Sequence, residues 1–158
     1  MIAGRARRLL GVACLAILGA AGPAICETLV DATAAYDPAN PFARILRGEL
    51  PADVVFENEH ALAFNDIRPT AKVHVLVIPK GAYTNILHFN AAASPAEKLA
   101  LLDAISQTAR IMRIDETGFR LATNTGSDGG QSVPHLHFHL LGGEPVHGRN
   151  AEAGLGHQ

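Results

Sequence analysis

Residues 126–143 read GSDGGQSVPHLHFHLLGG, the most informative stretch of the 158-residue chain. It places His135, His137 and His139 at alternate positions. Successive side chains of a β-strand point to opposite faces of the sheet. A strand over 135–141 therefore turns the three imidazoles to one face and sends the alternate apolar side chains into a core, namely Leu136, Phe138 and Leu140.

The segment before the three histidines indicates an anion-binding loop. It contains Gly129 and Gly130, followed by Ser132 and Val133. Glycine lets the backbone approach a ligand closely and offer N–H groups to an anion, and a serine hydroxyl adds another donor. We therefore predict a phosphate-binding loop that leads directly into the three imidazoles.

Two kinds of chemistry fit three imidazoles on one face. Alternate histidines on a strand are common zinc ligands, whereas a neutral imidazole can also act as a nucleophile. A catalytic zinc site often adds a carboxylate or a cysteine, and neither residue type lies beside this strand. The glycine-rich loop favours attack of a histidine on phosphorus, so we expect no metal and no other cofactor.

Patterns outside this stretch predict an α+β fold. Asn40 and Pro41 open a short N-terminal helix that ends at Gly48, and a capping box over 94–97 opens one long helix. The long helix carries apolar residues at spacings of three and four, namely Leu101, Leu102, Ile105, Ala109 and Met112. Strands are expected at 54–57, 61–64, 73–78, 119–124 and 135–141. Because strands and helices do not alternate, we expect an antiparallel sheet of about five strands.

The N-terminal residues predict export. Arg5, Arg7 and Arg8 precede an uncharged apolar run over 9–21 and a small-residue stretch over 22–24, the order of a secretory signal peptide. The run is shorter than the ~20 apolar residues that span a bilayer, so we expect no stable membrane span. The alternative is a cytoplasmic protein with a misassigned start codon. We expect a signal peptide over 1–26, a linker over 27–39 that contributes nothing to the site, a domain over 40–147 and a C-terminal tail over 148–158.

The composition restricts the partners of the protein. The formal net charge is −2, with 18% charged and 48% hydrophobic residues. These values are typical of a globular domain, and the bulk charge predicts no binding to a nucleic-acid backbone.

The residues 126–132 and 135–143 closely resemble the signature of the histidine-triad (HIT) superfamily, Hint branch, the purine nucleoside phosphoramidases. The resemblance covers about residues 40–147 and includes 63–67 and 74–80 in order and spacing. It implies a HIT-like fold and a homodimer formed through the long helix and neighbouring strands. It also implies a purine nucleotide substrate, hydrolysed through a nucleotidyl-histidine intermediate.

The resemblance further implies roles for single residues. His137 matches the nucleophile, His135 and His139 match histidines that orient it and contact the phosphate and leaving group, and His74 matches a fourth, outlying histidine. The positions that match nucleotide contacts are Asp66 at the ribose hydroxyls, Asn124 and Ser132 near the phosphate and leaving group, and the backbone of Gly130 and Val133 at the phosphate.

The implied reaction is hydrolysis of a nucleoside 5′-phosphoramidate, or of a related mixed nucleotide, to the nucleoside monophosphate. A dinucleoside polyphosphate hydrolase and a non-catalytic nucleotide-binding dimer are the alternatives, and Gly142 and Gly143 favour the Hint branch over the first. Many relatives hold a structural zinc with two cysteines near the first helix, together with histidines. Asn40 and Ala43 occupy those places in this chain, so we expect no such metal site.

Overall fold

The computed structural model describes residues 29–146. The expected signal peptide and C-terminal tail lie outside this range. Within it, no helix is both long enough and apolar enough to cross a membrane.

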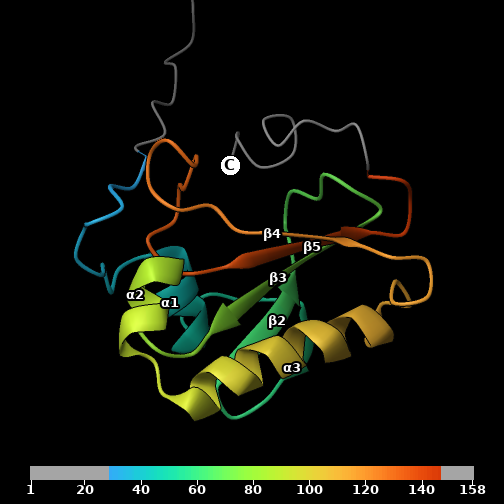
Figure 1. Ribbon diagram of the computed structural model, residues 1–158, viewed down its shortest axis with the longest axis horizontal. Helices are drawn as coiled ribbons and strands as arrows, with labels where there is room; N and C mark the ends of the chain where they lie inside the picture. Colours follow the sequence, from blue (N-terminus) through green and yellow to red (C-terminus); the bar gives the residue numbers. More distant parts are fainter. Residues whose placement is uncertain (1–28, 147–158) are drawn as a thin grey trace, which may run out of the picture.

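The core of the fold is one antiparallel sheet of five strands in the order β1-β2-β3-β5-β4 (Figure 1). The strands are β1 Val54–Glu57, β2 Ala61–Asn65, β3 Val73–Pro79, β4 Arg120–Ala122 and β5 Phe138–Gly142. The three helices are α1 Pro41–Leu46, α2 Ile86–Ala92 and α3 Pro95–Ile111. This architecture confirms the α+β class, the sheet of five antiparallel strands, the long helix and the short N-terminal helix.

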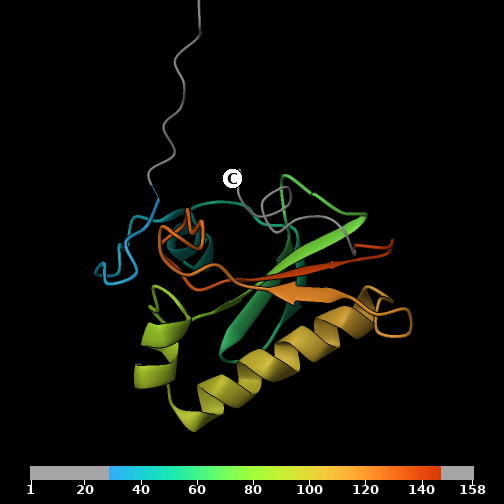
Figure 2. The same cartoon turned by 45° about the horizontal axis from the view of Figure 1, so that its top comes forward.

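One face of the sheet packs against α3, which runs diagonally across it (Figure 2). Alternate strand residues supply this core, including Ala63, Val75, Val77 and Leu140, and Leu136 joins them. From α3 itself the buried residues are Leu101, Ala104, Ile105, Thr108 and Ala109. Leu102, another apolar residue of α3, does not join this core, because it is 60% exposed.

The opposite face of the sheet carries a second core and the histidines. Its apolar residues are Phe42 from α1 together with Leu62, Phe64, Leu76 and Ile78. His74 on β3 pairs with Leu141 on β5, and Leu76 pairs with His139. Period-two alternation therefore separates α3 from the imidazoles, with the sheet between them.

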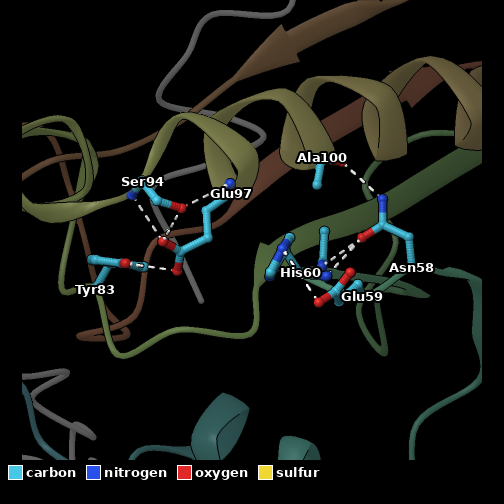
Figure 3. Close-up of polar contacts among 8 residues, drawn as sticks. Asn58, Glu59, His60, Tyr83, Ser94, Glu97 and Ala100 are labelled. Atoms are coloured by element: carbon cyan, nitrogen blue, oxygen red, sulfur yellow. Dashed lines mark hydrogen bonds and ion pairs between the residues drawn. The ribbon is translucent and has the colours of Figure 1, made fainter.

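The N-terminal end of α3 is fixed by polar contacts that Figure 3 shows. Glu97 closes the predicted capping box, since its carboxylate accepts from the Ser94 N–H and the Ser94 side chain accepts from the Glu97 N–H. The hydroxyl of Tyr83 also donates to Glu97, at 2.7 Å, and Asn58 Nδ2 donates to the Ala100 carbonyl, at 2.9 Å. These contacts tie α3 to the loop after β3 and to the β1–β2 turn.

Three elements differ from the sequence-based expectation. The last strand begins at Phe138 rather than His135, because the Leu136 N–H donates to the Tyr83 carbonyl and the His135 N–H to the Val133 carbonyl. Helix α2 was not predicted; Asn85 caps it by accepting from the N–H groups of Leu87 and His88. The strand expected over 119–124 is shorter, at Arg120–Ala122.

Residues 29–36, here called the N-terminal strap, lie against the domain although they form no helix or strand. The Val30 N–H donates to the Gln131 carbonyl at 2.8 Å, and Asn85 Nδ2 donates to the Ala32 carbonyl at 2.8 Å. Val30 is buried. In Figure 1 the strap, in blue, runs beside the orange loop that precedes β5. The residues expected to be a linker are thus hydrogen-bonded to the loop that leads to the histidines.

Candidate active site

The predicted site residues gather beside α1, around a cavity of about 220 Å³. Two triad histidines line it, His137 and His139. The other lining residues are Pro41, Phe42, Ile67, Arg68, Leu76, Asn124, Gly130, Ser132 and Val133. Among the described residues, His135, His74 and Asp66 are not part of this lining; all three are buried behind it.

The hydrogen bonds of His137 determine which ring nitrogen is available for chemistry. Its Nδ1 lies 2.7 Å from the backbone carbonyl of His135. A carbonyl oxygen only accepts, so Nδ1 carries the proton and Nε2 carries the free lone pair. Thr123 steadies the same residue, since its hydroxyl donates to the His137 carbonyl at 2.7 Å. The ring also packs edge-on against Phe42, at 5.2 Å between centroids.

His135 is held at both ring nitrogens. Its Nε2 lies 2.9 Å from the Pro79 carbonyl, which can only accept, so Nε2 carries the proton. Its Nδ1 then accepts from the Tyr36 hydroxyl, at 2.7 Å. This contact corrects the expectation that residues before 40 contribute nothing to the site. The ring is fully buried and away from the cavity, so His135 orients His137 through its backbone, and no contact of its ring with phosphate follows from this geometry.

His139 and His74 form a hydrogen-bonded pair whose direction is also fixed. The Thr70 N–H donates to His74 Nδ1 at 3.2 Å, which leaves the His74 proton on Nε2. That Nε2 lies 2.9 Å from His139 Nδ1, so His139 accepts there and keeps its own proton on Nε2. Because His139 lines the cavity, it offers an N–H donor to a ligand, in contrast to the lone pair of His137.

Asp66 lies beside this pair as a buried carboxylate. Its Oδ2 is 3.3 Å from His74 Nε2, and its Oδ1 accepts from the Arg68 N–H. Oδ2 is at ion-pair distance but receives no hydrogen bond from any residue within 29–146, because the His74 proton points to His139. Asp66 therefore acts on the imidazoles through its charge. Its predicted contact with ribose hydroxyls would require its carboxylate to turn towards the cavity.

Asp66, His74 and His139 could also hold a metal ion, since one ligand atom of each lies within 4.8 Å of the others. Binding through His74 Nε2 would move the proton of that ring to Nδ1. There it would face the Thr70 N–H, which already donates to Nδ1. The proton arrangement inferred from these hydrogen bonds therefore fits a hydrogen-bond chain better than a set of metal ligands.

Burial keeps the four imidazoles neutral. It lowers the pKa of His135 to about 4 and the pKa of His139 to about 3. It also lowers the pKa of His137 and of His74, and in both cases the charge of Asp66 partly offsets the effect. A neutral His137 with a free Nε2 lone pair is therefore the resting state at neutral pH.

The loop before the triad contributes side chains and selected backbone groups. The Gly130 N–H donates to the Ser127 carbonyl and the Gln131 N–H to the Gly126 carbonyl, so both close the loop on itself. Asn124 Nδ2 donates to the Gly130 carbonyl at 3.3 Å. Donors that could meet an anion in the cavity are the Ser132 hydroxyl and the Val133 N–H.

Sequence reasoning missed several residues that shape this site. The residues Tyr36, Phe42, Thr70 and Pro79 contact the imidazoles, and Thr123 contacts the His137 carbonyl; they come from separate parts of the chain. No local pattern marks them, because each acts through a backbone group, a hydroxyl or a ring edge. Only the pairing of β3 with β5 could have pointed to Pro79, as the residue that ends β3.

This arrangement agrees with the comparison with known proteins. The HIT domain family matches residues 47–146, so the chain belongs to this family. It is 53% identical over 108 residues to an uncharacterized 13.2 kDa HIT-like protein of Azospirillum brasilense, covering 68% of this chain and 88% of that protein.

A relative with a named activity and a solved structure extend the comparison. The chain is 42% identical over 118 residues to the purine nucleoside phosphoramidase of Escherichia coli, covering 72% of this chain and 95% of that enzyme. A HIT family hydrolase of Legionella pneumophila superposes with a TM-score of 0.63 at 41% identity, covering 68% of this chain and 95% of the other. The chain is thus a HIT family protein, and its relatives include proteins named as a phosphoramidase and as a hydrolase.

Proposed function

We propose that this protein hydrolyses purine nucleoside 5′-phosphoramidates, or related mixed nucleotides, to the nucleoside monophosphate through a nucleotidyl intermediate on His137. One observation carries the proposal. His137 Nδ1–H donates to the His135 carbonyl, which leaves a lone pair on His137 Nε2, and His74 donates to His139 Nδ1, which leaves a proton on His139 Nε2; both rings line one cavity. A nucleophile and a proton donor are the two groups that cleavage of a P–N bond requires.

In the first step, His137 Nε2 attacks the α-phosphorus and the P–N bond breaks. His139 takes up a second proton from solvent as the anionic substrate binds, and the leaving nitrogen takes the electron pair of the broken bond and one proton from this cationic ring, which returns to neutral. The anionic phosphate of the substrate favours the protonated form of His139, and the buried charge of Asp66 beside His74 favours it further. The nucleotidylated ring of His137 is cationic, and its Nδ1–H bond to the His135 carbonyl stabilises that charge.

In the second step, a water molecule replaces the departed amine. His139, now neutral, accepts a proton from this water as its oxygen attacks phosphorus. The P–Nε2 bond breaks, His137 recovers its lone pair, and the nucleoside monophosphate leaves. His139 ends the cycle with the proton that it gave to the amine, so the two steps balance.

The shape of the cavity supports a nucleotide ligand. Its volume of about 220 Å³ is below the ~300–1,000 Å³ of pockets that enclose a whole drug-sized ligand, so part of a nucleotide would lie at the rim. Ile67 is 91% exposed there, and Phe42 lines the same cavity, which gives a base an apolar surface. The polar end, at Ser132 and the two histidines, would take the phosphate.

The deciding experiment compares the wild type with His137→Asn on a panel of nucleoside phosphoramidates, with a dinucleoside polyphosphate included. Intact-mass spectrometry should detect a nucleotidyl adduct on the wild type alone. Turnover by the variant should fall by on the order of 10⁴-fold, because the nucleophile is gone. Its Kd for a purine nucleoside monophosphate, measured by calorimetry, should change by less than about tenfold, since the contacts to ribose and phosphate remain.

The control for this experiment is His88→Asn, which removes an exposed histidine outside the cavity. Turnover by the control should match the wild type. Turnover by His137→Asn within tenfold of the wild type would place the nucleophile elsewhere. Faster hydrolysis of the dinucleoside polyphosphate than of any phosphoramidate would favour the sister activity.

We also propose that the protein is a homodimer, formed through α3 and the edge strand β4. Leu99 and Leu102 on α3 are 69% and 60% exposed. Leu121 on β4 is 42% exposed and pairs with Leu140, so it lies on the α3 side of the sheet. A second copy would cover these apolar side chains and extend the sheet.

The oligomeric state tests this interface directly. In light scattering coupled to size exclusion, the wild type should elute with twice the mass of one chain, and Leu102→Glu should elute as a monomer. Leu87→Glu, which changes an equally exposed leucine on α2, is the control and should stay dimeric. A monomeric wild type would contradict the proposal.

A further inference from the structure

The N-terminal strap reaches the active site through one side chain. It is held to the domain by the bonds of Val30 and Ala32 and by the Thr84 hydroxyl, which donates to the Ala34 carbonyl at 3.4 Å. Gly126 leaves room for it, because a Cβ there would lie 2.8 Å from the Ala32 side chain. The strap is therefore fitted to the loop that precedes the triad, and Tyr36 stands at its end.

Tyr36 completes the hydrogen bonding of a buried ring. Its hydroxyl lies 2.7 Å from His135 Nδ1, and the two rings meet edge-on at 5.5 Å between centroids. Because the Pro79 carbonyl fixes the His135 proton on Nε2, Tyr36 is the donor. Without the hydroxyl, Nδ1 would be a buried acceptor with no partner, and the ring would be held at one nitrogen only.

The position of His135 sets the position of the nucleophile. The His135 carbonyl accepts the Nδ1–H of His137, and this bond aims Nε2 at the cavity. We propose that Tyr36 is a positioning residue, which acts through His135 to hold the His137 ring in the geometry required for attack on phosphorus. The proposal rests on the proposed function for its kinetic part only.

This role gives a function to residues that precede the range matching the HIT domain family. Tyr36 precedes residues 47–146, which match the HIT domain family. The strap therefore supplies one contact to the catalytic machinery from outside this matched range. Removing or displacing the strap should loosen the triad while the sheet and α3, which make no hydrogen bond with it among the described residues, stay folded.

The test uses Tyr36→Phe in the full chain, with Tyr83→Phe as the matched control. Both variants lose one tyrosine hydroxyl that donates a bond of 2.7 Å, but the Tyr83 hydroxyl contacts Glu97 on α3 instead of a histidine. Nitrogen-15 NMR of the imidazoles needs no substrate. In Tyr36→Phe the His135 Nδ1 signal should move towards that of an acceptor without a hydrogen bond, and in Tyr83→Phe it should not move.

Kinetics on a phosphoramidate then separate positioning from stability. A loosened nucleophile should lower kcat of Tyr36→Phe by about ten- to a hundredfold with KM within about threefold, because misplacement costs rate rather than binding. Tyr83→Phe should keep kcat, although thermal unfolding should show a loss of stability in both variants.

Each outcome decides the proposal. An unchanged His135 signal in Tyr36→Phe, or a shifted signal with unchanged kcat, would overturn it, since the contact would then be absent or purely structural. If the wild type fails to hydrolyse any phosphoramidate, the proposed function fails. Tyr36 is then judged by the His135 and His137 signals alone, and an unmoved His137 signal in Tyr36→Phe overturns its positioning role.

Discussion

Acid should destabilise this protein through the triad itself, and the size of the effect follows from burial. Burial lowers the pKa of His135 to about 4 and the pKa of His139 to about 3, from 6.5. The unfolded chain therefore binds protons at these positions that the folded protein does not bind. Their contribution to stability is fully present above pH 6.5 and is lost as the pH falls towards the folded values.

The magnitude can be worked out at pH 4.5, where both rings are still mostly neutral in the folded protein. The difference of two pH units between 6.5 and 4.5 is worth about 2.7 kcal/mol per histidine, at 1.36 kcal/mol per unit. The two histidines together lower the free energy of unfolding by about 5 kcal/mol. Because whole domains are stable by only ~5–15 kcal/mol, the protein should be close to unfolding at this pH.

Urea unfolding followed by circular dichroism at pH 7.5, 6.5, 5.5 and 4.5 measures this loss. His139→Gln, whose side chain does not titrate, should lose stability with pH less steeply than the wild type, by about 1.4 kcal/mol per unit between pH 6 and 4. His88→Gln, a change of an exposed ring, is the control and should keep the slope of the wild type. If His139→Gln keeps the slope of the wild type, the reasoning is refuted, because the His139 imidazole of the wild type must then take up its proton without unfolding the protein.

Four further outcomes are expected. Activity should survive treatment with a chelator, and loss that stoichiometric zinc restores would favour a metal site over the nucleophile. Because burial lowers the pKa of His137 from 6.5, kcat/KM should hold at pH 6.5 and fall only at lower pH; a midpoint above 6.5 would contradict this. Asp66→Asn should lower kcat by about ten- to a hundredfold by removing charge beside His74, while a change in KM alone would indicate ribose binding. The mature protein should begin near Ile25 and be periplasmic, which N-terminal sequencing checks and an intact Met1 in the cytosol would contradict.

The sequence predicted the elements of this fold where local signals agree with tertiary packing. The capping box at Ser94 and the helix start at Asn40 appear at the predicted positions. The boundary of the last strand could not be predicted in this way. Its ladder with β3 begins where Phe138 pairs with Val77, and the residues before it bond to the loop after β3 instead.

For the candidate site, the sequence indicated which face of the sheet carries the histidines but not how deeply each one is buried. Alternation correctly placed His139 on the face opposite α3, because a two-residue period determines the face of a strand, whereas His135 and His137 precede β5. It could not show that His135 lies behind the cavity whereas His137 and His139 line it. Depth depends on Phe42, Tyr36 and other groups brought in by tertiary structure, so it has no signature within residues 135–139.

The three triad positions carry the same side chain but cannot exchange roles, because their surroundings assign each a different proton arrangement. The Pro79 carbonyl and the Tyr36 hydroxyl occupy both nitrogens of His135, which leaves that ring nothing to offer a substrate. A backbone carbonyl accepts a hydrogen bond from Nδ1–H of His137, so the lone pair on Nε2 faces the cavity. At His139 the order is reversed, because His74 donates to the far nitrogen and the proton faces the ligand. The division into nucleophile, proton donor and support therefore follows from the backbone of neighbouring segments, and a substitution that reverses one of these bonds should abolish the role while keeping the histidine.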